Sequence, residues 1–294
     1  MVQINKKLAA YLNDFMSEVD MKTRTAAIYF LLVLPILTSC FRQAYFLSPF
    51  NATTNYYHGI PMSKDSVKSA TYISGAVSVG GANEYFHDEV FSFNGYFHRS
   101  HNFNKLQAWY GANLSIGSYH LDSDSYYSNP NYTNPIYRGG TKFFGGLGVS
   151  GGMNVVMPMG TRHEWRVIGM ESTLQNEYGS YLDFRKKLPD SAANAITRSK
   201  IFVTAGLTTE FVFRRRSGTT IGYKLAIGSS LQQTNRYYFD YSNYRGSINP
   251  MYISNTLQIT RKSVTGFGQV NFGDYAANFQ MGVTYRLGGR KTFN

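Results

Sequence analysis

Between residues 69 and 287, apolar and polar residues alternate with period two along much of the chain. From 201 to 213 the odd positions are mostly apolar, and the positions between them include Thr204, Gly206 and Glu210. Successive side chains of a β-strand point to opposite faces of the sheet, so this pattern predicts strands with one apolar face. Nine stretches show it: 69–80, 88–99, 106–119, 142–157, 164–178, 201–213, 220–231, 262–272 and 278–287.

The length of these stretches favours a membrane. Many reach ten residues or more, whereas strands of soluble proteins run about five or six residues and membrane-spanning strands need about 9–11. The non-apolar faces carry mainly Gly, Ser, Thr, Asn and Gln, which is typical of the interior of a narrow barrel surrounded by lipid. An open sheet edge would leave backbone groups unsatisfied in hydrocarbon. The sequence therefore predicts an all-β protein, a closed antiparallel transmembrane β-barrel with long extracellular loops.

The sequence leaves two strand numbers open, 8 and 10. Bacterial single-chain barrels have an even number of strands, so a count of nine is incomplete or contains an error. Either the stretch 262–272 or a segment before residue 69 is misread, or a tenth strand is hidden elsewhere.

Connector lengths support the same fold. Outer-membrane barrels join their strands by tight periplasmic turns and longer outer loops. His98 and His101 flank a tight turn, and we expect both to be exposed. The long connectors are rich in Tyr, Asn, Ser and Pro, which suits loops that contact headgroups or a partner. The short connectors are 100–105, 158–163 and 215–218, and the long ones are 120–141, 179–198 and 233–260.

Three charged residues fall on inward positions of the predicted strands. By the alternation, Glu171, Glu210 and Lys224 point into the barrel, where opposite charges on neighbouring strands would pair. A sealed polar interior is one interpretation of this set, and a proton or ion path is the other. The Gly-rich inner face of 142–157 predicts a tight lumen filled by side chains, which argues against free diffusion of nutrients.

The front of the chain reads as a targeting segment. Lys22 and Arg24 form a basic region ahead of about twelve mostly apolar residues, which suits a signal peptide better than a membrane span of about 20 residues. The sequence Leu-Thr-Ser-Cys at 37–40 resembles the bacterial lipobox. The resemblance implies that residues 21–39 are a lipoprotein signal peptide and that Cys40 carries acyl chains such as palmitate. The alternative is a buried cysteine in an ordinary hydrophobic helix.

Residues 1–20 precede a signal that works without them, so they are interpreted as a non-native extension. The start codon is therefore Met1 or Met21.

The strand pattern and the lipobox together resemble the OmpA/OmpX-like class of small outer-membrane β-barrels of Bacteroidota, joined to a lipoprotein signal. The resemblance implies a Gram-negative outer-membrane protein with a lipidated linker at 40–68, a barrel at 69–289 and a tail at 290–294. Residues 41–43 after Cys40 are not acidic, which predicts a lipid on the periplasmic leaflet. The chain departs from the class at its end, because Asn294 follows the aromatic Phe293.

Two tripeptides, Asp-Ser-Val at 65–67 and Asp-Ser-Ala at 190–192, resemble the short O-glycosylation motif of that phylum. The resemblance implies O-glycosylation at Ser66 and Ser191.

Charge and candidate chemistry narrow the function. The net charge is +12, but Lys and Arg are scattered apart from the short run at 214–216, so nucleic acid is not an expected partner. The single cysteine excludes an intramolecular disulfide. None of the 6 histidines belongs to a zinc motif, and no nucleophile elbow is present. We therefore predict no catalytic, metal or cofactor-binding residue, and no cofactor beyond the covalent lipid on Cys40.

The sequence thus favours a non-enzymatic structural or accessory subunit of an outer-membrane complex, such as barrel-assembly, secretion or uptake machinery. Its expected partners are outer-membrane lipids, lipopolysaccharide and another outer-membrane protein. The alternatives are a small transport pore, a lipid-modifying enzyme and a soluble secreted β-protein.

Overall fold

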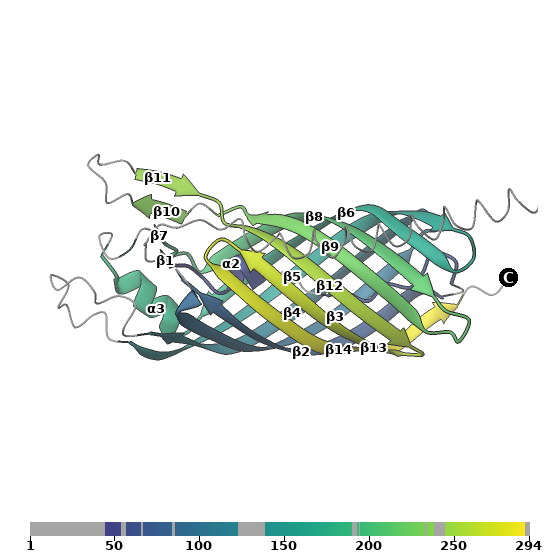
Figure 1. Cartoon of the computed structure of the whole chain (residues 1–294), viewed down its shortest axis with the longest axis horizontal. Helices are drawn as coiled ribbons and strands as arrows, with labels where there is room; N and C mark the ends of the chain where they lie inside the picture. The colour runs from purple at the N-terminus through teal and green to yellow at the C-terminus, as the bar shows by residue number, and fades with distance from the viewer. Residues whose placement is uncertain are drawn as a thin grey trace, which may run out of the picture. The chain divides into compact units, whose positions relative to one another are not determined.

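Ten strands close into one antiparallel barrel in the computed structural model (Figure 1). The structure describes residues 45–53, 57–65, 67–83, 86–122, 139–189, 193, 195–232, 234–237 and 245–291. The predicted all-β closed barrel is confirmed, with the larger of the two strand numbers. The barrel strands are β2 (Val67–Ala82), β3 (Asp88–Asn102), β4 (Leu106–Leu121), β5 (Gly140–Met159), β6 (His163–Tyr178), β8 (Ile201–Arg214), β9 (Thr220–Ser230), β12 (Met251–Arg261), β13 (Val264–Gly273) and β14 (Ala276–Lys291).

The strand missing from the sequence-based count is β12, most of which falls within the stretch 233–260 that the sequence assigns to a long loop. This assignment was wrong, and the stretch 262–272 is a genuine strand, β13. The outer face of β12 is not uniformly apolar, because Asn255 lies among its outward positions and accepts a hydrogen bond from the Tyr223 hydroxyl at 2.6 Å. One polar residue on the lipid side interrupts the alternation. Because the preceding residues are rich in Tyr and Ser, the sequence pattern then predicts a loop instead of a strand.

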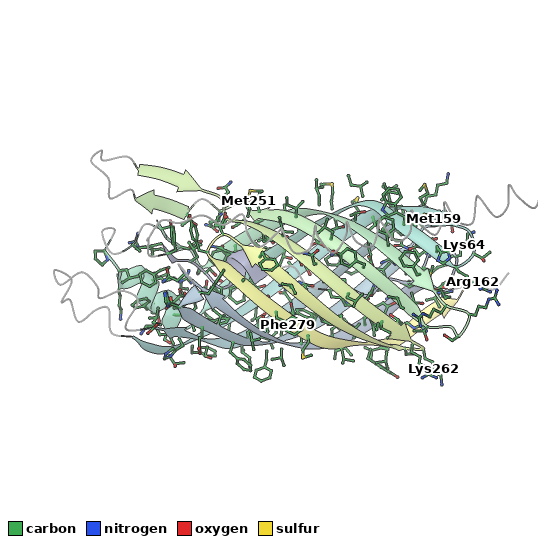
Figure 2. All side chains as sticks on the ribbon, viewed as in Figure 1. Lys64, Met159, Arg162, Met251, Lys262 and Phe279 are labelled. Atoms are coloured by element: carbon green, nitrogen blue, oxygen red, sulfur yellow. The ribbon has the colours of Figure 1, made fainter. Side chains whose placement is uncertain are left out.

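The outer surface of the barrel is apolar and its interior is polar, the reverse of a water-soluble protein. On β4, for example, Leu114 points outward and is 44% exposed, whereas its inward neighbours Asn113 and Ser115 are buried. Figure 2 shows the side chains of Met159, Met251 and Phe279 projecting from the outside of the wall. Exposed large hydrophobic residues occur on all ten strands, which is the pattern of a lipid-facing surface.

The connections differ in length between the two ends of the barrel. At one end, here named the short-turn end, the strands are joined by 103–105, 160–162, 215–219 and 262–263. At the other, named the loop end, they are joined by 83–87, 122–139, 179–200, 231–250 and 274–275. This asymmetry assigns the short-turn end to the periplasm and the loop end to the outside.

The loop end carries secondary structure of its own. Helix α3 (Ser180–Lys187) follows β6, and a small sheet pairs β1 (Tyr45–Phe46), β7 (Ala195–Ile196), β10 (Thr234–Tyr237) and β11 (Arg245–Ile248). Figure 1 shows these elements gathered beyond one end of the barrel. The remaining helix, α2 (Phe50–Thr53), is a single turn. Within the described residues, no helix has the length and hydrophobicity of a membrane span.

Replacing Leu114 by arginine tests the lipid-facing surface. Leu114 lies near the middle of β4, so the charge would enter the centre of the hydrocarbon layer and reduce the free energy of unfolding by about 2–4 kcal/mol. Leu106→Arg is the matched control, because Leu106 begins the same strand beside a turn, where the cost falls to about 0–1 kcal/mol. Urea unfolding in phospholipid vesicles measures both. Equal costs for the two variants would contradict the assignment.

Candidate functional site

The lumen is occupied by the chain that precedes the barrel. Residues 45–53 lie at the loop end, where α2 packs against β8, β12, β13 and β14. Residues 57–65 continue through the lumen and contact inward side chains of the wall. We name residues 45–53 and 57–65 together the plug. The sequence predicts only a linker over 40–68, whereas the structure places much of it inside the barrel.

Hydrogen bonds between the plug and the wall show the order in which the plug residues pass along the lumen toward the short-turn end. The Tyr57 hydroxyl donates to the Gln258 side chain of β12. One residue beyond His58, the carbonyl of Gly59 lies 3.0 Å from Nε2 of His98 on β3.

The last plug residues reach the short-turn end. The Asn102 side-chain amide donates to the carbonyl of Met62 at 2.8 Å, and Lys64 Nζ donates to the carbonyl of Gly160 in the β5–β6 turn at 2.7 Å. The plug therefore runs from the loop end to the short-turn end. Figure 2 shows Lys64 at the same end of the barrel as Arg162 and Lys262.

A buried charge cluster clamps the plug to the wall. Arg166 of β6 donates to Glu210 of β8 at 2.6 Å and to Glu164 of its own strand at 3.0 Å. Its third contact is the plug, because Nη2 donates to the carbonyl of Ile60 at 3.0 Å. Arg166 is 2% exposed and Glu164 is 1% exposed, so these charges are held away from bulk water. Breaking such a pair leaves an uncompensated buried charge.

Both carboxylates of the cluster accept further hydrogen bonds. Glu164 receives the backbone N–H of Ser63 and, at 3.1 Å, the side-chain amide of Gln107. Glu210 receives the side-chain amide of Gln258, the residue that also binds Tyr57. Residues of β4, β6, β8 and β12 are thereby joined through the plug into one network.

Two other charge pairs lie in the same interior. Lys224 of β9 donates to Glu171 of β6 at 2.6 Å. Nearer the loop end, Arg185 of α3 pairs with Glu177 of β6, and both side chains are fully buried. Ser48 of the plug donates to the same Glu177 carboxylate at 2.6 Å.

The three charged residues that the alternation predicts to point inward do face the lumen, and each has a charged partner. Glu171 pairs with Lys224, and Glu210 pairs with Arg166. Sequence reasoning missed Glu164 and Arg166. The register of β6 against β8 shifts between Arg166 and Gly169, so the inward positions change from even to odd numbers along the strand. Strict alternation counted from Glu171 would turn both residues toward lipid.

Two histidines stack against aromatic rings in the lumen. His58 of the plug lies 3.5 Å from the Trp109 ring, nearly parallel to it, and His98 stacks on Tyr72 at 4.8 Å. The expectation that His98 is exposed was wrong, since only 1% of it is accessible. Strand β3 extends to Asn102, which places His98 on the inner wall before the turn begins.

Glycines on the inner face of β5 make room for this filling, as the predicted tight lumen requires. A Cβ atom at Gly146 would lie 2.3 Å from Gln175 Nε2 and 2.6 Å from the Phe50 ring of the plug. At Gly148 it would lie 2.3 Å from the Asn113 side chain. Any larger residue there would displace the plug or inward side chains of the neighbouring strands β4 and β6.

The loop end is closed by an apolar cap. Tyr181 of α3 stacks on Tyr119 at 3.9 Å, and its hydroxyl donates to the carbonyl of Leu47 at 3.1 Å. Burial raises the pKa of Tyr181 well above its usual value, so the hydroxyl stays a donor. Residues from the plug, the strands and the loops form this cap: Phe46, Phe50, Ala82, Tyr119, Leu121, Phe144, Tyr181, Leu188, Ala193, Ile196 and Phe202.

Three residues singled out from the sequence, Cys40, Ser66 and Ser191, lie outside the described residues. Within the described part of the chain, no group of three or more His, Cys, Asp or Glu side chains is placed to hold a metal ion. The charged groups of the lumen instead bind one another and the plug.

Arg166→Met tests the clamp. The change leaves Glu164 and Glu210 buried without their cation, and we expect the free energy of unfolding to fall by about 3–5 kcal/mol. The triple variant Glu164→Gln, Arg166→Met and Glu210→Gln removes the uncompensated charges and should recover most of that loss. Urea unfolding in vesicles measures both. A triple variant as unstable as the single one would show that charge pairing is not what holds this region.

Comparisons with known proteins return structures only. No protein-family model matches the chain, and no curated protein matches it. The transport unit of the autotransporter AIDA-I from Escherichia coli is 11% identical, with 80% of this chain and 95% of that chain covered and a TM-score of 0.33. The β domain of the Bordetella autotransporter BrkA is 8% identical, with 74% and 99% covered and a TM-score of 0.43. The outer membrane protease OmpT from Escherichia coli is 9% identical, with 75% and 95% covered and a TM-score of 0.31.

These sequence identities and TM-scores are too low to assign a fold or a function to the present chain. Its own strand pairing and its apolar exterior identify it as a ten-stranded transmembrane β-barrel of the outer-membrane type.

Proposed function

We propose that this protein is a non-enzymatic accessory subunit of an outer-membrane complex, a lipoprotein acylated on Cys40 whose barrel is closed to diffusion. The observation that carries the proposal is the plug, which binds inward side chains on several strands around the wall. A barrel that is sealed by its own chain acts through its surfaces rather than through its lumen.

The contacts of the plug argue against a freely open pore. Opening would break the bonds from Arg166 to Ile60, from Glu164 to Ser63 and from Glu177 to Ser48. Each leaves a buried polar or charged group without its partner, at a cost of about 1–3 kcal/mol or more. Several such losses together make spontaneous opening a rare event.

The described part of the loop end supports a docking role. Arg185 ties α3 to the rest of this end, because it donates to the carbonyl of Thr197 at 2.7 Å and pairs with Glu177. The same helix leaves Lys186 and Lys187 exposed. A loop region with its own helix and sheet offers a preformed surface, so a partner need not pay the entropy of ordering it. The proposed partners are another outer-membrane protein and the surrounding lipids, including lipopolysaccharide.

Planar bilayer recordings test whether the lumen is closed. The wild-type protein should give no conductance steps, whereas a variant that lacks residues 45–63 should conduct, because the polar wall then encloses water. Folding of the deletion variant is checked by its heat-modifiable migration in gel electrophoresis. Lys64→Ala is the control, since this exposed side chain binds only a turn carbonyl and its loss should leave the barrel silent. Steps from the wild-type protein would favour the transport-pore alternative.

Crosslinking of native outer membranes with a lysine-reactive reagent, followed by mass spectrometry, tests the accessory role. We expect the protein to co-purify with a larger complex in mild detergent, and Lys186 and Lys187 to crosslink to the partner. The double variant Lys186→Arg and Lys187→Arg keeps the charge but should lose these crosslinks. Lys262→Arg, at the opposite end, should keep them. A protein that migrates alone and crosslinks to no partner from either end would contradict the proposal.

A further inference from the structure

The plug has a direction, and this direction decides where the preceding chain leaves the barrel. Its last described residue, Asp65, lies at the short-turn end, where it pairs with Arg214 at 2.7 Å, and β2 begins two residues later. Its first described residue, Tyr45, lies at the loop end. The described chain therefore crosses the barrel once inside the lumen before it crosses again as the first wall strand.

The position of Tyr45 is fixed by contacts with three separate connections of the loop end. Its backbone N–H donates to the Asn83 side chain of the β2–β3 turn at 2.9 Å. Its ring stacks on Tyr275 of the β13–β14 turn at 3.3 Å. In the β6–β8 connection, Ala195 pairs with it in a parallel bridge. The start of the plug is thus level with the turns of the outer side.

The other terminus of the barrel lies at the opposite end. Lys291, the last residue of β14, pairs with Val67, the first residue of β2. Both belong to the short-turn end. A simple barrel without a plug would have its two flanking segments on the same side of the membrane, and here the N-terminal one is carried to the other side.

Chain length then limits where Cys40 can be. Tyr45 follows Cys40 by five positions, and a fully extended chain spans at most about 18 Å over five Cα-to-Cα steps. The apolar band of an outer-membrane barrel is about 25 Å tall, and the hydrocarbon core is about 30 Å thick. A chain that starts at the loop end cannot bring Cys40 back to the periplasmic side within five steps. Residues 41–44 lie outside the described residues.

We propose that the chain before Tyr45 emerges on the outside of the outer membrane, so that the acyl chains on Cys40 insert into the outer leaflet. The part about lipid rests on the proposed function, which assigns the acylation. This proposal differs from the periplasmic-leaflet expectation drawn from residues 41–43. The protein would then be a lipoprotein whose polypeptide passes through its own barrel, and the barrel must close around the plug during assembly.

A protease site inserted between Gln43 and Ala44 tests the topology in intact cells labelled with palmitate. We expect the externally added protease to cleave this site without permeabilisation and to separate a labelled N-terminal fragment from the barrel. The same site placed at residue 130, in the β4–β5 loop, serves as the external control. The same site placed between Lys262 and Ser263, in a turn of the short-turn end, should be cleaved only after permeabilisation.

Each outcome separates the inference from the proposed function. Cleavage in intact cells without palmitate on the fragment supports the outward exit and removes the lipid on Cys40. Palmitate labelling with cleavage only after permeabilisation, as at the turn site, leaves the lipid and overturns the outward exit. Cleavage of the turn site in intact cells, with the loop site protected, overturns the orientation itself.

Single-thiol variants test the topology independently of acylation and without an inserted protease site. Cys40 is the only cysteine, so Cys40→Ala combined with Ala44→Cys leaves one thiol, and Cys40→Ala combined with Lys262→Cys is its matched control. A membrane-impermeant maleimide should label the residue-44 variant in intact cells and the residue-262 variant only after permeabilisation. Equal protection of both thiols in intact cells would overturn the inference.

Discussion

The need to satisfy every backbone hydrogen bond in hydrocarbon is the constraint on which this structure depends. Lipid offers no donors or acceptors, so each strand must pair on both sides and the sheet must close. The pairing of β14 with β2 and of β9 with β12 achieves this. Closure then sorts the side chains, because the period-two alternation sends one set to lipid and the other into a polar interior.

That polar interior creates a second requirement, which the plug meets. Inward groups such as Arg166, Glu164 and Asn102 need partners, and the wall supplies only some of them. The backbone of the plug supplies further partners, through the carbonyls of Ile60 and Met62 and the N–H of Ser63. The sealed lumen and the outward course of the N-terminal chain are therefore two consequences of one set of contacts. Function is accordingly sought at the surfaces of the barrel.

The sequence predicted the strands of the barrel wall more completely than the segment that fills the lumen. The inward positions of Glu171, Glu210 and Lys224 follow from alternation within single strands, and the predicted tight lumen follows from the glycines of β5. Glu164 and Arg166 escaped because a register shift in β6 reverses the alternation, and β12 escaped because Asn255 stands on its lipid face. The path of residues 57–65 through the lumen could not be predicted, because this segment shows no periodic pattern of apolar and polar residues. It is irregular and is held by partners that are distant in sequence.

The sequence by itself determined the fold class, the lipid-facing surface and the end at which the long loops lie, because these depend on local alternation and on spacing along the chain. Only the tertiary structure decided that there are ten strands, that Arg166 joins two carboxylates to Ile60, and that Tyr45 and Asp65 lie at opposite ends of the lumen. Those facts depend on which residues meet across the barrel. A pattern read along one strand contains no information about register between strands or about the path of a segment enclosed by them.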